Sequence, residues 1–252
     1  MHENLFLCYI ENLYRSFRRK KLWGQVCLLN QNVPAPIDEK SLLSFYTIDD
    51  EEITRMLKDE LEDRVKNQIA AVATERYRVM HISQPLWYAL KIFRYLEKYG
   101  AVSVGSRYTF MGGGSGGGIM MKAGIEIPEP TLEECGIVLR TREQAVRVFV
   151  ERRRLSEDME GGHFRFCGRL SRESHLRMAR LWHCDGALMH LNRGCEGYAQ
   201  GLPQVRLAFV ENNIPALTYE GNVGDPREFD EARTFTRIDT FFESQGLDKL
   251  EG

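Results

Sequence analysis

The sequence predicts an α/β protein in which a helical N-terminal region precedes an open, mostly parallel, Rossmann-like sheet of about four strands. Two observations carry this prediction. Residues 1–75 hold apolar side chains at helical spacing, whereas residues 76–252 alternate short apolar runs with amphipathic segments about four times. Strands and helices that alternate in this way favour parallel strands joined by right-handed crossovers. We therefore expect a helical region over 1–75 and an α/β domain over 76–252.

The N-terminal region is predicted to contain two helices separated by prolines. Apolar residues recur at helical spacing from Leu5 to Phe17, and prolines at 34 and 36 interrupt the pattern. The second helix begins in the acidic run at 49–52, which suits the positive end of the helix dipole. Its apolar stripe, which predicts a face packed on a core, consists of Ile53, Leu57, Leu61, Val65 and Ile69.

The rest of the chain supplies the strands. Residues 76–83 and 101–108 are predicted as strands on either side of a helix that Gly100 ends in the left-handed conformation. Two further strands are expected at 184–191 and 214–220. Because ligands of open parallel sheets bind beyond the carboxyl ends of the strands, we expect the chemistry among the residues that follow each strand.

Two helix starts in the second half carry capping signals. Thr141 and Gln144 have the spacing of a capping box. Asp225, Pro226 and Glu228 combine an N-cap, a proline in the first turn and a capping-box acid, so the last helix is expected to begin there.

A glycine-rich run, MGGGSGGG at 111–118, has no regular pattern. Its six glycines in eight residues favour a flexible loop, because glycine loses the most backbone entropy on ordering. Phosphate binding is an alternative, but a phosphate-binding loop continues with Gly-Lys-Ser/Thr at the start of a helix, and GIMMKAG stands here instead. An artificial linker is the third interpretation.

The composition argues against several classes of protein. The 252 residues include 34 basic and 36 acidic ones, so the net charge of −2 lacks the basic excess of a nucleic-acid binder. No apolar run approaches the roughly 20 residues of a membrane span. Met1 is followed by polar residues rather than by a secretory signal, so we expect a cytoplasmic protein. The six cysteines form no CxxC pair, which argues against a disulfide scaffold.

The stretch HLNRGCEGYAQG at 190–201 places Cys195 between two glycines, directly after a predicted strand. Three interpretations stay open: a structural thiol in a tight turn, a nucleophile with His190 as its base, and a metal or iron–sulfur ligand. Arg193 favours the thiolate, which is the form that attacks or binds metal. Glycines also let backbone amides approach whatever binds the sulfur.

The other candidates lie beside this thiol or after the first strand. Side chains next to Cys195 are expected beside a bound cluster or on the side of the substrate, and the glycines are expected to permit close backbone approach. Trp87 opens a helix, where it would line an acyl pocket or pack in the core. Cys8 and Cys27 lie in helical stripes and are expected in the core. The candidates near the thiol are His190, Arg193, Gly194, Glu196 and Gly197.

Several segments of the chain resemble the benzoyl-CoA reductase and 2-hydroxyacyl-CoA dehydratase family. Within that family, they are most similar to the C-terminal portion of the B-type subunit of benzoyl-CoA reductase. The resemblance covers most of residues 20–252, and the segment around Cys195 is its most specific part. The segments that carry it, in chain order, are 60–80, 84–108, 132–146, 190–209 and 214–251.

The resemblance implies an oxygen-sensitive heterodimer, with a homologous second subunit, that acts on acyl-CoA thioesters. An ATP-hydrolysing iron–sulfur partner would supply the low-potential electrons. We expect reduction of an aromatic acyl-CoA, as in benzoyl-CoA reductase. Ketyl-radical dehydration of a 2-hydroxyacyl-CoA is one alternative, because both reactions use the same kind of cluster and electron source. A truncated, non-catalytic partner subunit is the other.

The resemblance also implies a [4Fe–4S] cluster held by three cysteines of each catalytic subunit. Cys195 matches the third of them, and the other two are expected in an N-terminal domain that precedes the stretch present here. Because such a cluster normally takes four ligands, we expect the isolated chain to bind no stable cluster and to be inactive alone.

Overall fold

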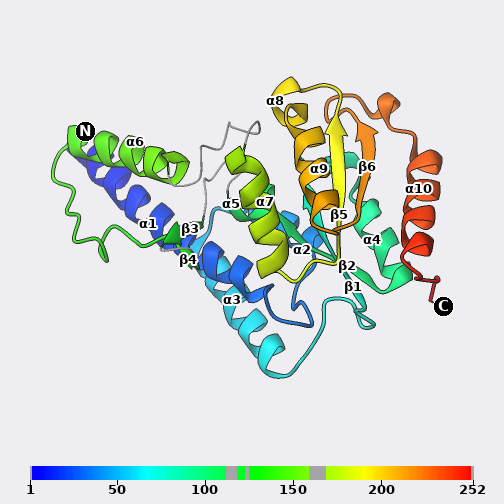
Figure 1. Cartoon of the computed structure of the whole chain (residues 1–252). Coiled ribbons are helices and arrows are strands. Elements are labelled where there is room, and N and C mark those ends of the chain that lie inside the picture. Colours follow the sequence, from blue (N-terminus) through cyan, green and yellow to red (C-terminus); the bar gives the residue numbers. More distant parts are fainter. Residues whose placement is uncertain (1, 112–117, 123–124, 159–168, 251–252) are drawn as a thin grey trace.

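A four-stranded parallel sheet forms the centre of the molecule, which confirms the predicted fold class (Figure 1). The computed structural model describes residues 2–111, 118–122, 125–158 and 169–250. In their order across the sheet the strands are β2 (Ala101–Ser106), β1 (Tyr77–Ile82), β5 (Gly186–Asn192) and β6 (Ala216–Gly221). All four were predicted within two residues of their observed bounds.

The strand order creates a switch point in the middle of the sheet. From β1 the chain crosses to β2 on one side, and it later returns to β5 on the other side of β1. The register places His81 of β1 beside Leu188 of β5, and His190 of β5 beside Tyr219 of β6. The loops after β1 and β5 diverge at this point, and ligands of open α/β sheets bind there.

Helices cover both faces of the sheet (Figure 1). Successive strand residues point to opposite faces, so two apolar cores form. Met80 and Met189 pack in one core with helices α1 (His2–Leu29), α7 (Arg169–Leu181) and α9 (Leu202–Glu211). Val79 and Leu188 pack in the other with α4 (Lys91–Leu96) and α10 (Glu231–Ser244). Among the described helices, none is long and apolar enough to cross a bilayer.

The N-terminal part contains one helix more than the sequence predicted. Between α1 and α3 (Glu51–Lys66) lies α2 (Glu39–Tyr46), whose N-cap Asp38 accepts a hydrogen bond from the Ser41 amide at 3.2 Å. A second element that the sequence did not reveal is a hairpin of β3 (Ile119–Lys122) and β4 (Ile125–Pro128), which lies against α1. Most of the glycine-rich run before it, 112–117, lies outside the described residues.

The two predicted capping signals had different outcomes. The capping box is confirmed, because the Thr141 hydroxyl accepts from the Gln144 amide and the Gln144 side chain accepts from the Thr141 amide, both at 3.2 Å. It begins α6 (Arg142–Asp158). The predicted start of the last helix is wrong: Asp225 caps only the single turn η3 (Pro226–Glu228). A second acid, Asp230, caps α10 instead.

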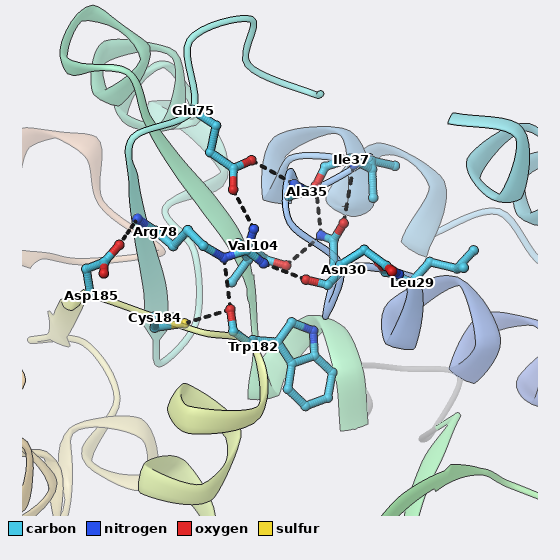
Figure 2. A network of polar contacts seen from close by, with 11 residues as sticks. Leu29, Asn30, Ala35, Ile37, Glu75, Arg78, Val104, Trp182, Cys184 and Asp185 are labelled. Carbon is cyan, nitrogen blue, oxygen red and sulfur yellow. Dashed lines mark hydrogen bonds and ion pairs between the residues drawn. The ribbon is translucent and has the colours of Figure 1, made fainter. Parts of the chain in front are cut away.

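A buried polar network joins the N-terminal helices to the sheet (Figure 2). The Arg78 guanidinium on β1 donates to the carbonyl of Trp182 at 2.9 Å, to the carbonyl of Asn30 at 2.7 Å and to the Glu75 carboxylate at 2.5 Å. The Asn30 amide in turn donates to the Val104 carbonyl of β2 at 2.7 Å. These bonds fix the end of α1 against the two strands.

Candidate functional site

The loops after β1, β2 and β5 meet at the carboxyl edge of the sheet. After β1, Ser83 has a left-handed φ of 82°, which is uncommon for a residue with a side chain and is often found at functional sites. Its hydroxyl lies 3.4 Å from the carbonyl of Tyr198, in the short helix α8 (Glu196–Ala199) that follows β5. This contact bridges the switch point.

Cys195 lies at this bridge as the residue that precedes α8. Its backbone is extended, with φ −146° and ψ 104°, and its carbonyl accepts from the amides of Tyr198 at 3.2 Å and Ala199 at 3.1 Å. The thiol is free and half-buried, and it makes no capping bond to the helix. The sulfur is therefore accessible to a bound group at the edge where the sequence places it.

Four aromatic side chains from separate segments gather at the same edge, and we call them the aromatic quartet: Tyr46, Trp87, Tyr108 and Tyr198. Tyr108 is the second residue of the short helix α5 (Arg107–Met111), and its ring contacts the other three rings. Its ring centroid lies 5.6 Å from that of Tyr46, 6.4 Å from that of Trp87 and 6.4 Å from that of Tyr198. Trp87, at 37 % exposed, is the open end of the quartet.

The three phenols of the quartet stay protonated at neutral pH. Burial is the largest cause in each case, and it raises the pKa of Tyr46, Tyr108 and Tyr198 above the usual value of 10. The nearby Cys195 thiol also raises the pKa of Tyr198, which places the sulfur within electrostatic reach of the quartet. The edge can therefore offer hydrogen-bond donors and flat apolar surface beside a thiol.

His190 is buried and held by two backbone carbonyls. Its Nδ1 lies 2.6 Å from the carbonyl oxygen of Gln84, and its Nε2 lies 3.3 Å from that of Gly221. Burial lowers the pKa of His190 to about 4, so the ring is neutral at pH 7. Because each ring nitrogen faces a carbonyl, the ring is not placed to take a proton from Cys195, as the nucleophile interpretation requires.

None of the remaining candidates beside Cys195 is seen to form a common site with the sulfur in the described residues. Arg193 forms an exposed ion pair with Glu220 on β6, so its charge is already matched. Glu196 is exposed at the start of α8. A side chain at Gly194 would collide with the Asn222 amide, so the close approach there is to the protein itself. Gly197 has open space apart from the Cys195 sulfur at 3.8 Å.

The other cysteines do not join Cys195. Cys27 is fully buried in the core, as predicted, but Cys8 is exposed and its predicted place in the core is wrong. Cys135 is exposed and Cys184 half-buried, and Cys167 lies outside the described residues. Within the described ranges, no group of three or more His, Cys, Asp or Glu side chains could hold a metal ion. These residues alone therefore do not supply the ligands of a four-iron cluster.

Fold and site define a Rossmann-like α/β protein with a thiol and aromatic donors at its switch point. The chain belongs to the family described as 2-hydroxyglutaryl-CoA dehydratase, D-component, whose pattern matches residues 11–123 and 165–244. This confirms the predicted family. Proteins of the family typically bind iron–sulfur clusters.

Two characterised relatives are similar to this chain. The alpha subunit of (R)-2-hydroxyglutaryl-CoA dehydratase from Acidaminococcus fermentans is 25% identical over 238 residues, which cover 90% of this chain and 43% of that protein. The alpha subunit of (R)-phenyllactyl-CoA dehydratase from Clostridium sporogenes is 36% identical over 67 residues, or 26% of this chain and 15% of that protein. The matched residues cover less than half the length of each relative. Both relatives are named as alpha subunits of dehydratases, which does not support the predicted likeness to the B-type subunit of benzoyl-CoA reductase.

Proposed function

We propose that this chain is a subunit of an enzyme that removes water from an (R)-2-hydroxyacyl-CoA. The observation that supports this most is the family match together with the names of both relatives, which are dehydratases of 2-hydroxyacyl-CoA thioesters. Reduction of an aromatic acyl-CoA is then the alternative. By the same resemblance, the chain would work in the cytoplasm with a homologous second subunit and an ATP-hydrolysing iron–sulfur electron donor.

The proposed site is the carboxyl edge at the switch point. Cys195 is the proposed iron ligand, supported by its half-buried free thiol and by its place in the matched segment 165–244. The other ligands of the cluster would come from outside the described residues. The aromatic quartet would form the wall against which the acyl group lies, with Trp87 at its open end.

The activity is tested on the complex in which the chain occurs, purified without oxygen. We expect water loss from a 2-hydroxyacyl-CoA such as (R)-2-hydroxyglutaryl-CoA, followed by mass spectrometry of the unsaturated product. Benzoyl-CoA serves as the competing substrate, and loss of its aromatic absorbance would show a reductase instead. Consumption of benzoyl-CoA with no dehydration of any 2-hydroxyacyl-CoA would contradict the proposal.

The role of Cys195 is tested by replacing it with serine or alanine. We expect the complex to lose iron bound at this site and to lose more activity than the roughly 10- to 100-fold that removal of a group supporting a ligand costs. The matched control is Cys135→Ser. This thiol is exposed, and it follows β4 rather than one of the three strands whose loops form the carboxyl edge. Full iron content and activity in Cys195→Ala would exclude the ligand role.

A non-catalytic partner subunit is the second candidate, and it is favoured because the described residues place a single thiol at the edge. In that case the wild-type complex needs this chain for assembly, yet Cys195→Ala changes neither iron content nor turnover. Anaerobic reconstitution of the isolated chain tests the iron site further. About four irons per chain would contradict the expectation that the isolated chain binds no stable cluster, and would count against a non-catalytic role.

A further inference from the structure

The hydroxyl of Tyr46 is buried and has no hydrogen-bond partner within 3.5 Å among the described residues, although the Tyr108 phenol is near enough to raise its pKa further. The side chain is only 6% exposed, and it ends α2 on the side of the sheet edge. Burying a hydroxyl without a partner is unfavourable, because its bonds to water are lost and nothing replaces them. An orphan of this kind in a native protein therefore calls for an explanation.

Other buried tyrosines of the described chain show that the fold normally satisfies this group. The hydroxyl of Tyr77 donates to the Asp185 carbonyl at 3.1 Å, and that of Tyr99 donates to the Asp239 carboxylate at 2.6 Å. The hydroxyl of Tyr219 lies 2.9 Å from the His81 imidazole. Only Tyr46, the one that belongs to the aromatic quartet, lacks such a bond in the described part of the chain.

The ring of Tyr46 is held in place from two sides. Its centroid lies 6.1 Å from that of Trp23, whose indole N–H is bonded to the Thr109 carbonyl at 2.9 Å, and 5.6 Å from that of Tyr108. Its own carbonyl accepts from Arg19 at 3.2 Å. With ring and backbone both fixed, the hydroxyl cannot swing out to water, and it stays directed at the quartet beside Cys195.

The chemistry of the group defines what it would bind. Burial raises the pKa of the Tyr46 phenol, so at neutral pH it is a neutral donor rather than an anion. A neutral donor held next to aromatic rings suits an oxygen acceptor that carries an apolar group. Among the parts of an acyl-CoA, the thioester carbonyl has this character because the acyl chain is attached to it. Free CoA lacks this carbonyl, and its own carbonyls are the two amides of the pantetheine arm.

We propose that Tyr46 donates a hydrogen bond to the carbonyl oxygen of a CoA thioester bound at the aromatic quartet, and so favours thioesters over free CoA. This inference rests on the proposed function, because it takes the acyl-CoA site to lie at this edge. It adds a residue that positions the substrate to a site otherwise defined by Cys195.

The test compares Tyr46→Phe with wild type by calorimetric titration of the complex that contains the full chain, under anaerobic conditions. The ligands are butyryl-CoA, which has the carbonyl but no 2-hydroxyl to eliminate, and free CoA. We expect the variant to bind butyryl-CoA about three- to tenfold more weakly, as for one neutral hydrogen bond, and free CoA as wild type does. Its unfolding midpoint without ligand should equal or exceed that of wild type, since no bond is lost.

Tyr77→Phe is the matched control, because it removes a buried hydroxyl that has a partner at the opposite end of the sheet. It should lower the unfolding midpoint and leave the ratio of the two affinities unchanged. The inference is overturned if Tyr46→Phe leaves both affinities unchanged, weakens both equally, or unfolds as early as Tyr77→Phe. A wild-type complex that binds neither ligand would refute the proposed function and the inference with it, whereas normal wild-type binding isolates the failure to Tyr46.

Discussion

The network around Arg78 and the region around α2 are both buried and polar, but they differ in how completely they are paired. Every nitrogen of the Arg78 guanidinium has a carbonyl or carboxylate partner (Figure 2). By contrast, all the buried side-chain atoms found without a hydrogen bond in the described residues lie on α2, at its N-cap or against it. They are Asp38 Oδ2, Glu39 Oε1, His81 Nδ1 and Tyr46 Oη, of which Glu39 Oε1 and His81 Nδ1 face each other at 3.6 Å.

We infer from this difference that the Arg78 network serves the stability of the fold and that the α2 region serves binding. A paired network fixes one arrangement of helices and strands, because each broken bond would leave a buried group unsatisfied. Incomplete pairing of buried polar groups lowers stability. It is retained where binding or catalysis needs the unpaired group, as at functional sites. The α2 region contains Tyr46 of the quartet and reaches the sheet through Glu39, whose carboxylate accepts from the Ser103 hydroxyl at 2.6 Å.

The largest expected effect is the loss of stability when the paired network around Arg78 is broken. Arg78→Met removes the cation while Glu75, with its side chain 4% exposed, keeps a buried carboxylate. Loss of one partner of a buried ion pair costs about 3–5 kcal/mol, so the free energy of unfolding in urea should fall by that amount. A loss below about 1 kcal/mol would show that this network does not hold the fold, and the comparison would fail.

The next largest effect is the change in folding stability with pH that His190 causes. Since the pKa of His190 is lowered to about 4 in the folded chain and is near 6.5 when unfolded, the unfolded chain binds the extra proton first as pH falls. Folding stability should therefore drop between pH 6.5 and pH 4, by about 3 kcal/mol, and level off below. His190→Gln should remove this part of the drop in unfolding titrations.

Asp239 provides the contrast at the amino end of the sheet. Burial acts to raise the pKa of Asp239, but hydrogen bonds from Tyr99, Lys249 and Tyr95 outweigh it and the net pKa is lowered from 3.8. The stability from this group is present above pH 3.8 and is lost as pH falls further. Asp239→Asn should thus leave the pH 6.5 to 4 segment unchanged. If His190→Gln also leaves it unchanged, the assignment to His190 is wrong.

The smallest effect is expected on the surface beside Cys195. Arg193 and Glu220 form an ion pair with side chains 58% and 34% exposed. Exposed pairs contribute at most about 1 kcal/mol and less at high salt, so Arg193→Ala should shift the unfolding free energy by no more than that. A larger loss, or one that persists in 1 M salt, would show that Arg193 contributes to the site's structure.

Local signals predicted the elements that depend on local chemistry. The Thr141 capping box and the end of a helix at Gly100, with φ 61°, follow from neighbours a few residues apart. The start of α10 was misplaced because Asp225 and Asp230 are equally good caps on local grounds, and only the turn between them decides which one continues as a helix. Nothing local marked the three tyrosines of the quartet as a group.

The sequence by itself determined the alternation of strands and helices, the thiol between glycines, and the family to which the chain belongs. Each depends on residue order and short-range spacing. The tertiary structure alone decided that β1 lies beside β5, and so brought Tyr46, Tyr108 and Tyr198 to the same edge. It also decided that the Tyr46 hydroxyl is unpaired, because whether a buried group finds a partner depends on side chains far away in the chain.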